Sequence, residues 1–503
     1  MDANFDKPQR QSSIGVLVMF FDSLQKFGRA FLPLIFIYIL KFKELNLVYV
    51  ILVFTLFLSV AAGIAYLKFR NFTFYIDDKN DEFIINEGIF NKTKTTIKLN
   101  KIQQVTINQN LLQRIINIYS LKVDTAGSEK NEAHIKAISN ELAQELKSIL
   151  LENEVKKEFV NSVSNDQIPI EIASPKSLLF LKIKVSSLLK VGITSNYVKS
   201  IGLLLTFFFT ILENLRNIGK EDLIDENKIQ KVVEYYPAVF GLFVFIAVLF
   251  ATIFLINIVR TLVKFFNYTI TNQKGSLLLS YGLINKESTI LKPEKVQIVK
   301  ISSNYFQKKL NVLEVKIKQA TNDSDSDKKS QVEIPGCNQT EKEAILKLIF
   351  KGQPVKKVTL NSNFRKLVFS IFISIVLPVF IFFIFGQYIY SAWFDYANFV
   401  IAYIIFVLTI LFFSYRNYKL FIGDNHIIKQ SGAWDIQNEI MEINKIQAIT
   451  TSQLFWHKNL NIGSITVHTA GGNVSFQLGN YAKIKEYVNL WLYEIETSNS
   501  NWM

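Results

Sequence analysis

Long apolar runs alternate along this chain with segments in which apolar and polar residues take turns at every second position. The apolar runs come in three pairs, and an alternating stretch of about fifty residues follows each pair. A run of about 20 apolar residues is long enough to cross a bilayer as a helix, whereas period-two alternation is typical of a half-buried strand. The pattern therefore predicts pairs of membrane helices, each followed by a small domain of short antiparallel strands.

The predicted membrane spans are 31–47 with 47–67, 198–215 with 237–259, and 367–390 with 396–413. Lys41 and Lys43 interrupt the first span, so their side chains would have to extend to the membrane interface. Two other segments, 14–28 and 174–195, have an amphipathic pattern, which predicts that they lie in the interface. Pro378 predicts a kink in the fifth span.

The alternating segments repeat one sequence pattern three times. In each copy a glycine ends a short strand, a glutamine follows after fifteen residues, and an alanine follows after thirty-eight. These positions are Gly88, Gln103 and Ala126, then Gly282, Gln297 and Ala320, then Gly432, Gln447 and Ala470. Repetition at fixed spacing indicates that one structural unit is used several times.

Basic residues and a helix recur in the same register. A lysine precedes each glutamine by two residues (Lys101, Lys295, Lys445), and a cation follows it after eleven (Arg114, Lys308, Lys458). Helical patterns follow at 139–151, 340–350 and 481–492. For the middle helix, Thr340 and Glu343 fit a capping box. Each copy thus predicts six or seven strands, closed by a helix that protects the strand edges.

On these residues the chain resembles the bacterial pleckstrin-homology-like (PH-like) domain of membrane proteins of the YdbS/YdbT type. The first copy carries the resemblance through Gly88, Ile102, Gln103, Val105, Leu112, Arg114, Leu121, Val123, Thr125, Ala126 and Gly127. The third copy keeps Thr469, Ala470 and Gly471, whereas the second keeps only Ala320, which predicts an altered hairpin there. The resemblance implies a fold and a membrane setting, but not an activity.

The expected fold class is α+β with membrane helices. About six transmembrane helices form three pairs, and each pair precedes a small PH-like β-barrel or bent sheet with a C-terminal capping helix. The expected organisation is a cytoplasmic N-terminus with an interfacial segment (1–28), transmembrane pair 1 (29–67), PH-like domain 1 (68–158), a second interfacial segment (174–195), pair 2 (197–259), domain 2 (266–352), pair 3 (365–415) and domain 3 (416–497).

Composition and charge place these elements at a membrane. Half of the 503 residues are hydrophobic and only 19% are charged, which is too apolar for an ordinary soluble protein. The net charge of +14 fits lysines that face an anionic leaflet, and no nucleic-acid recognition motif accompanies it. Basic residues flank the domain-side ends of the spans, such as Arg260 and Lys264, so the domains are predicted to be cytoplasmic at a bacterial inner membrane.

The sequence offers no candidate for catalysis. It contains no nucleophile elbow, phosphate-binding loop or dinucleotide fingerprint, and its four histidines and one cysteine, Cys337, lack the spacing of metal ligands. We therefore predict no catalytic residue, no cofactor and no metal site. A transporter is disfavoured because the span interiors hold almost no ionisable residues.

The candidate contact residues are basic. From Tyr268 to Ala320 the second copy has nine lysines against three glutamates, whereas the first copy is near neutral and the third is neutral. Candidate contacts to lipid headgroups or to a partner are Lys292, Lys295, Lys300, Lys308 and Lys309, with Lys101, Arg114, Lys445 and Lys458 at the recurrent positions. The alternative is that these residues cover solvated strand faces. For Lys101, Lys295 and Lys445 the fold itself can require the lysine, for instance to cap a carbonyl at a strand end.

Three functions remain open at this point. The chain can be a non-catalytic scaffold whose cytoplasmic domains bind protein partners or each other, because strand edges pair readily with another chain. It can sense or handle anionic lipid through the basic second domain. A transporter is the third alternative.

Overall fold

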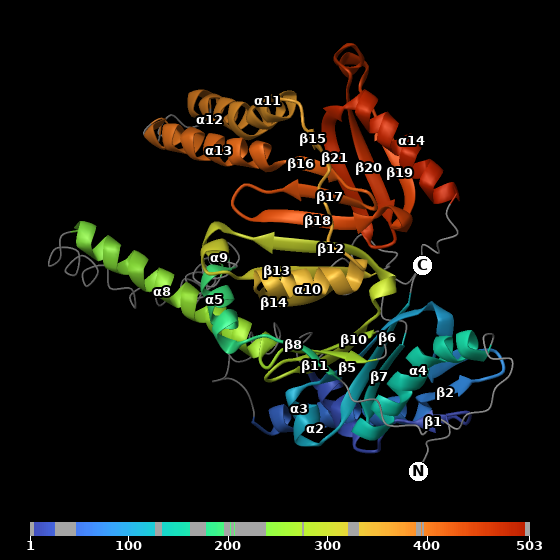
Figure 1. Ribbon diagram of the computed structural model, residues 1–503. Helices are drawn as coiled ribbons and strands as arrows, with labels where there is room; N and C mark the ends of the chain where they lie inside the picture. Colours follow the sequence, from blue (N-terminus) through green and yellow to red (C-terminus); the bar gives the residue numbers. More distant parts are fainter. Residues whose placement is uncertain are drawn as a thin grey trace.

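The computed structural model shows three small domains in a row, from which apolar helices extend (Figure 1). The structure describes residues 5–25, 47–125, 133–160, 178–195, 238–273, 276–319, 331–388, 394 and 397–497, with the single positions 202 and 206.

Each domain contains two sheets of three antiparallel strands and one helix that packs against them. In domain 1 the strands are β2 (Thr73–Asp77), β3 (Glu82–Glu87) and β4 (Thr93–Lys98), then β5 (Ile102–Gln109), β6 (Tyr119–Thr125) and β7 (Ala133–Ile138). In domain 2 they are β9 (Thr269–Gln273), β10 (Ser276–Tyr281) and β11 (Lys286–Leu291), then β12 (Val296–Ser303), β13 (Leu313–Gln319) and β14 (Gln331–Cys337). In domain 3 they are β16 (Lys419–Ile422), β17 (His426–Ser431) and β18 (Ile436–Glu442), then β19 (Ile446–Ser452), β20 (Ile462–Thr469) and β21 (Gly472–Asn480). The packed helices are α4 (Asn140–Val160), α10 (Gln339–Phe350) and α14 (Tyr481–Thr497).

Each domain also has an extra edge strand that the repeat pattern did not reveal. These strands are β1 (Gln9–Arg10), β8 (Leu178–Lys182) and β15 (Val358–Asn361), and they pair with β2, β9 and β16. They precede the apolar segments, so they lie outside the repeated stretch of sequence. Part of the segment expected to be amphipathic, 174–195, is therefore a strand, and within its described residues, 178–195, the helix is α5 (Val185–Thr194).

The sheets continue from one domain into the next. Strand β5 of domain 1 pairs with β11 of domain 2, and we call this contact the first junction. Strand β12 of domain 2 pairs with β18 of domain 3, and we call this the second junction. Each junction completes a seven-stranded sheet, so the three domains form one array (Figure 1).

The two junctions use the same register. At the first, Lys286 lies opposite Gln109 and Thr289 opposite Thr106. At the second, Ile436 lies opposite Ser303 and Glu439 opposite Lys300. When the three copies are aligned on their recurrent glycine and glutamine, these pairs occupy equivalent positions. The chain thus builds one kind of contact twice.

The hydrophobic cores follow the same plan. In domain 1 the strands bury Phe74, Phe83 and Leu121 against Leu146 of α4. The core of domain 2 includes Ile428 and Ile440 from domain 3. Because apolar side chains of neighbouring domains share one core, separating the domains would expose apolar surface to water.

Three described helices have the length and composition to cross a membrane. They are the window Val248–Phe265 in α8 (Ala238–Phe265), the segment Arg365–Tyr388, and α13 (Ala397–Asn417). Helix α2 (Leu47–Asn71) occupies the predicted second span. The predicted first and third spans lie outside the described residues, apart from the two single positions. Six spans in three pairs therefore stay a prediction.

The segment Arg365–Tyr388 contains a distortion where Pro378 was expected to cause a kink. It consists of α11 (Arg365–Ile371), a π-helical turn (Phe372–Val376) and α12 (Leu377–Tyr388). Proline lacks the N–H that would bond the carbonyl of Ser374 four residues earlier. Tyr403 of α13 donates its hydroxyl to that carbonyl at 2.6 Å, which joins the two helices at the distortion.

The structure corrects the predicted capping box of α10. The N-cap is Asn338, whose side chain accepts from the backbone N–H of Glu341, while Glu341 bonds the N–H of Asn338. Thr340 donates its hydroxyl to Asn338 and does not cap the helix. The prediction was wrong by two residues because asparagine caps a helix as well as threonine does.

The recurrent glycine has a conformational reason. Gly282 has φ of +110°, and a Cβ at this position would lie 1.9 Å from the carbonyl oxygen of Asn285. Gly88 and Gly432 have nearly the same φ and the same close contact. The tight hairpin that brings β11 or β18 to a junction therefore requires glycine.

We expect Gly282→Ala to lower the free energy of unfolding by about 1–3 kcal/mol, because alanine is strained at positive φ and clashes with the Asn285 carbonyl. The measurement is the thermal unfolding midpoint of the detergent-solubilised protein. The matched control is Gly352→Ala, whose Cβ would have its nearest neighbour, the Phe350 carbonyl oxygen, at 3.9 Å. Equal melting of both variants would contradict the argument.

Candidate functional site

The first junction is joined by side chains as well as by strand pairing. The hydroxyl oxygens of Thr106 and Thr289 lie 3.3 Å apart in a buried position. Arg114 of α3 (Leu111–Ile115) donates to the carbonyl of Leu283 at 3.0 Å. Lys295 donates to the carbonyl of Ile102 at 3.0 Å. Each of these contacts links domain 1 to domain 2.

The second junction repeats this scheme with different residues. An ion pair of 3.2 Å between Lys300 and Glu439 replaces the pair of threonines. Lys445 donates to the carbonyl of Glu294 at 2.8 Å, as Lys295 does at the first junction. Although burial acts to raise the pKa of Glu439, Lys429 and Lys300 together hold it below its usual value. The carboxylate therefore stays charged at neutral pH.

An aromatic contact completes the second junction. Trp434, at the tip of the β17–β18 hairpin, lies against Tyr305 and Phe306 of α9 (Tyr305–Lys309). The ring centroids are 6.3 Å and 5.7 Å apart. Edge and tilted arrangements at such distances are favourable beyond the area that they bury.

Several of the basic residues singled out in the sequence thus contact the neighbouring domain. Lys295, Lys300, Lys445 and Arg114 bond a carbonyl or a carboxylate across a junction. The other candidate cations are exposed or half-buried: Lys101, Lys292, Lys308, Lys309 and Lys458. Lys309 places its ammonium 5.0 Å from the Tyr305 ring centroid. A role in binding lipid or a partner stays a prediction for all nine.

Lys147 is a junction residue that the sequence reasoning missed. It lies in α4 with only 2% of its surface exposed, and its amino group lies 3.2 Å from the Ser288 hydroxyl and 3.4 Å from the Ser288 carbonyl. Burial lowers its pKa to about 7. The equivalent positions in α10 and α14 are Leu346 and Val488, so a comparison of the three helices could have revealed it.

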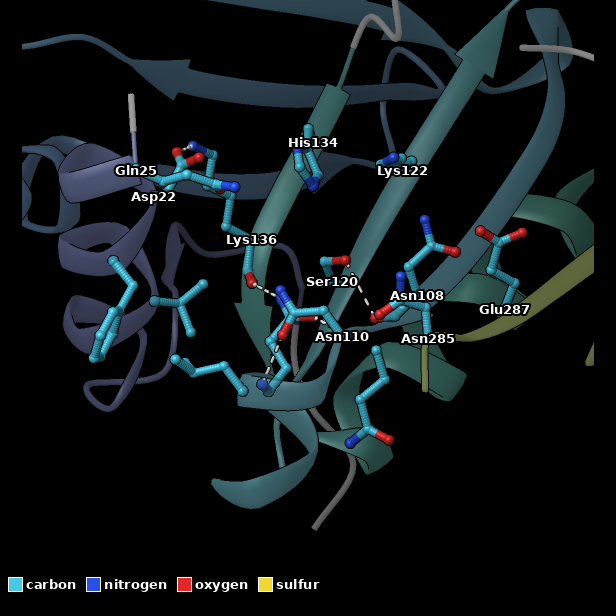
Figure 2. Close-up of a pocket in the computed structure, with 15 residues that line it drawn as sticks. Asp22, Gln25, Asn108, Asn110, Ser120, Lys122, His134, Lys136, Asn285 and Glu287 are labelled. Carbon is cyan, nitrogen blue, oxygen red and sulfur yellow. Dashed lines mark hydrogen bonds and ion pairs between the residues drawn. The ribbon is translucent and has the colours of Figure 1, made fainter. Parts of the chain in front are cut away.

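A pocket of about 660 Å³ lies beside the first junction. Figure 2 shows Asp22, from the helix Gly15–Gln25, next to Lys136 on one side, and Asn285 and Glu287 from domain 2 on the other. Asp22 and Lys136 form an ion pair, and Gln113 donates to the Lys136 carbonyl at 2.8 Å. The first segment expected to be amphipathic therefore packs on domain 1 and forms a wall of this pocket.

A second pocket, of about 780 Å³, occupies the equivalent place beside the second junction. Helix α5 replaces the helix Gly15–Gln25, and Trp434, Asp435 and Gln437 come from domain 3. Its cations are Arg260, Lys264, Lys300, Lys316 and Lys318, and its acids are Glu314, Glu333 and Asp435. Glu333 bonds both Lys264, at 2.5 Å, and Lys316, at 3.4 Å. The pocket lies at the domain end of α8 and has an excess of positive charge.

The described residues contain no group of three histidine, cysteine or acidic side chains that could hold a metal ion. Cys337 is buried, and burial raises the pKa of its thiol. Ala320 and the hairpin expected to be altered after it lie outside the described residues. What the structure brings together at the junctions is therefore binding chemistry: strand edges, cations and aromatic rings.

Comparison with known proteins agrees with this architecture. The model of the bacterial PH domain family matches the chain three times, over residues 29–154, 220–353 and 371–494. The chain is also 25% identical over 408 residues to the UPF0699 transmembrane protein YdbT of Bacillus subtilis (strain 168), which covers 74% of this chain and 77% of that protein. The three-fold resemblance read from the sequence is confirmed.

We expect the free energy of unfolding to rise with pH between about 7 and 10.5, because the unfolded chain keeps a proton on Lys147 that the folded chain releases. Lys147 alone makes the free energy of unfolding rise by at most about 1.4 kcal/mol per pH unit. Lys147→Leu, which introduces the residue found at Leu346 in α10, should remove this pH dependence. It should also raise stability at pH 7. The measurement is the thermal midpoint at pH 7 and pH 9.5.

The control for this experiment is Lys347→Leu, at an exposed position of α10, which should keep the pH dependence of the original protein. If Lys147→Leu melts lower than the original protein at both pH values, the amino group stabilises the junction and the argument from burial is wrong.

Proposed function

Because the chain belongs to the bacterial PH domain family and carries helices fit to cross a membrane, we propose that it is a non-catalytic membrane scaffold. Its three PH-like domains would act as one cytoplasmic array that binds protein. The observation that carries this proposal is the pair of junctions, at which sheets run from one domain into the next in one register. A rigid array holds its binding surfaces at fixed positions relative to the membrane.

The distribution of charge supports the cytoplasmic side. Basic residues stand where membrane helices meet the domains, as with Lys68 and Arg70 at the end of α2, Lys264 near the end of α8 and Arg416 at the end of α13. Such residues favour the side of the membrane from which the protein inserts.

The array also offers protein-binding surface. Phe455 is 74% exposed and Trp456 is 54% exposed, next to each other at the outer end of domain 3. Phe90, on the β3–β4 hairpin of domain 1, is 98% exposed. Aromatic residues are enriched in the contact surfaces of proteins because they bury a large area with few rotatable bonds. Their exposure at both ends of the array favours binding of protein there.

A photo-reactive amino acid at position 455 of the full-length protein tests this proposal in intact membranes. We expect illumination to give adducts heavier than the protein alone by the mass of a polypeptide. The control places the same group at Glu486, on an exposed face of α14. If both positions give only lipid or water products, the scaffold proposal fails.

The second pocket favours a second candidate function, the binding of anionic lipid headgroups. Arg260, Lys300, Lys316 and Lys318 face a space at the domain end of a membrane-spanning helix, where headgroups lie. A cation near an anionic surface contributes about 1 kcal/mol to binding. The acids of the pocket offset part of this attraction, and so this function ranks second.

We expect Arg260→Gln to weaken retention of anionic lipid by about five-fold, the equivalent of about 1 kcal/mol. The measurement is the number of anionic lipids that stay bound to the full-length protein in native mass spectrometry, at low and high salt. Lys309→Gln, outside the pocket, is the control. Equal retention by both variants would rule out the pocket as a headgroup site.

A further inference from the structure

We propose that a second copy of this chain binds end to end, by pairing its β4 with β19 of the first copy, and so builds between chains the junction that each chain contains twice. The inference rests on the scaffold function proposed above and names the partner: another molecule of the same protein. Four independent features of the two ends of the array support it.

The first feature is the strand order. Strands β4, β11 and β18 are equivalent, and so are β5, β12 and β19. The junctions use β11 with β5 and β18 with β12. Within the described part of the chain, β4 pairs only with β3, and β19 only with β20. Domain 1 therefore presents one strand of such a junction, β4, and domain 3 presents the other, β19.

The second feature is the register. If β4 and β19 pair as the internal strands do, Lys92 lies opposite Gln453 and Thr95 lies opposite Thr450. A threonine pair at this position is what the first junction contains, as Thr106 and Thr289. Thr450 is exposed, whereas its equivalent Thr106 is buried. The two ends thus carry the same pair of residue types as the first junction, with the Thr450 hydroxyl 2.9 Å from Nε2 of His468.

The third feature is aromatic. Phe90 stands at the position of Trp434, and Phe455 and Trp456 stand at the positions of Tyr305 and Phe306. Those three residues contact each other at the second junction. Their counterparts at the ends are 98%, 74% and 54% exposed. An end-to-end contact would place Phe90 of one copy on Phe455 and Trp456 of the next and cover part of each ring, as at the second junction, where Tyr305, Phe306 and Trp434 stay 52%, 47% and 56% exposed.

The fourth feature is the recurrent lysine. Lys295 and Lys445 each donate to a carbonyl of the preceding domain. Lys101 occupies the same position in domain 1, the first of the three domains described, and its side chain is exposed. In the proposed contact it reaches the carbonyls of residues 444–446 in the neighbouring copy. The recurrent glutamine shows the same difference in exposure. Gln297 is 1% exposed at the second junction, whereas its equivalent Gln447, at the end of the array, is exposed.

Such a contact is heterologous, because different surfaces of the two copies meet. Heterologous contacts produce a closed ring when the rotation between copies closes, and an open chain when it does not. Helices α8, α12 and α13 extend from the same side of the array in Figure 1. Copies joined end to end can therefore keep these three helices of each copy on one side of the joined array.

Cysteine cross-linking of the full-length protein in its membrane tests the proposal. In a Cys337→Ala background, one tagged copy carries Thr95→Cys and a differently tagged copy carries Thr450→Cys. Because the equivalent threonine oxygens lie 3.3 Å apart at the first junction, we expect mild oxidation to give an adduct of two chains that holds both tags. Each cysteine alone, in both tagged forms, is the control and should give no such adduct.

Two further variants test the geometry of the internal junction and the role of Phe90. Thr106→Cys with Thr289→Cys in one chain should cross-link internally and shows that the junction geometry accepts a disulfide. Phe90→Asp should abolish the adduct between chains and leave this internal cross-link unchanged, which separates loss of the contact from loss of folding.

The proposal is overturned if the internal pair cross-links and the pair between chains does not, or if either cysteine alone gives the adduct equally well. The scaffold function has a different signature. If the polypeptide adducts at position 455 contain other proteins and no second copy of this chain, the scaffold proposal holds and the self-association proposal is wrong. If no polypeptide adduct forms there, both proposals are wrong.

Discussion

Pairing of strand edges in one fixed register is the constraint on which the rest of this structure depends. A strand edge presents unpaired N–H and C=O groups, and a small sheet has two such edges. Here the edge of one domain satisfies the edge of the next, through β5 with β11 and β12 with β18. The glycines at positive φ, the cations that bond carbonyls across the junctions and the shared apolar core all serve to bring these edges together.

The junctions also explain why basic residues are poor guides to function in this chain. Lys300 and Lys445 belong to the surplus of charge that suggests an anionic ligand, yet each bonds an oxygen atom of the neighbouring domain. Arg260 differs, because it lies on the membrane-spanning helix α8 itself, at the end that lines the second pocket, which Lys300 also lines. A count of charges along the sequence does not distinguish a cation that bonds a neighbouring domain from one that lines a pocket, since both need a long side chain with a charged end.

Much of the domain fold could be predicted from the sequence, since Gly88, Gly282 and Gly432 hold the same backbone conformation and the strands between them alternate as expected. The edge strands β1, β8 and β15 could not, because they lie on the far side of the apolar segments from the strands that they join. The junctions escaped prediction for a related reason. Alternation shows which face of a strand is buried, but it carries no information about which edge finds a partner.

Chemical differences between the two junctions disfavour strand pairings other than those in the structure. The first has a pair of threonines where the second has Lys300 with Glu439. If β12 paired with β11, Lys300 would lie against Thr289, and the half-buried charge of Lys300 would lose its partner Glu439, which is costly. The same rule excludes β12 as a partner for β4, which offers Thr95. Strand β19 has the uncharged Thr450 at the position of Lys300. Strand β4, with Thr95, is therefore better suited to pair with β19 than with β12.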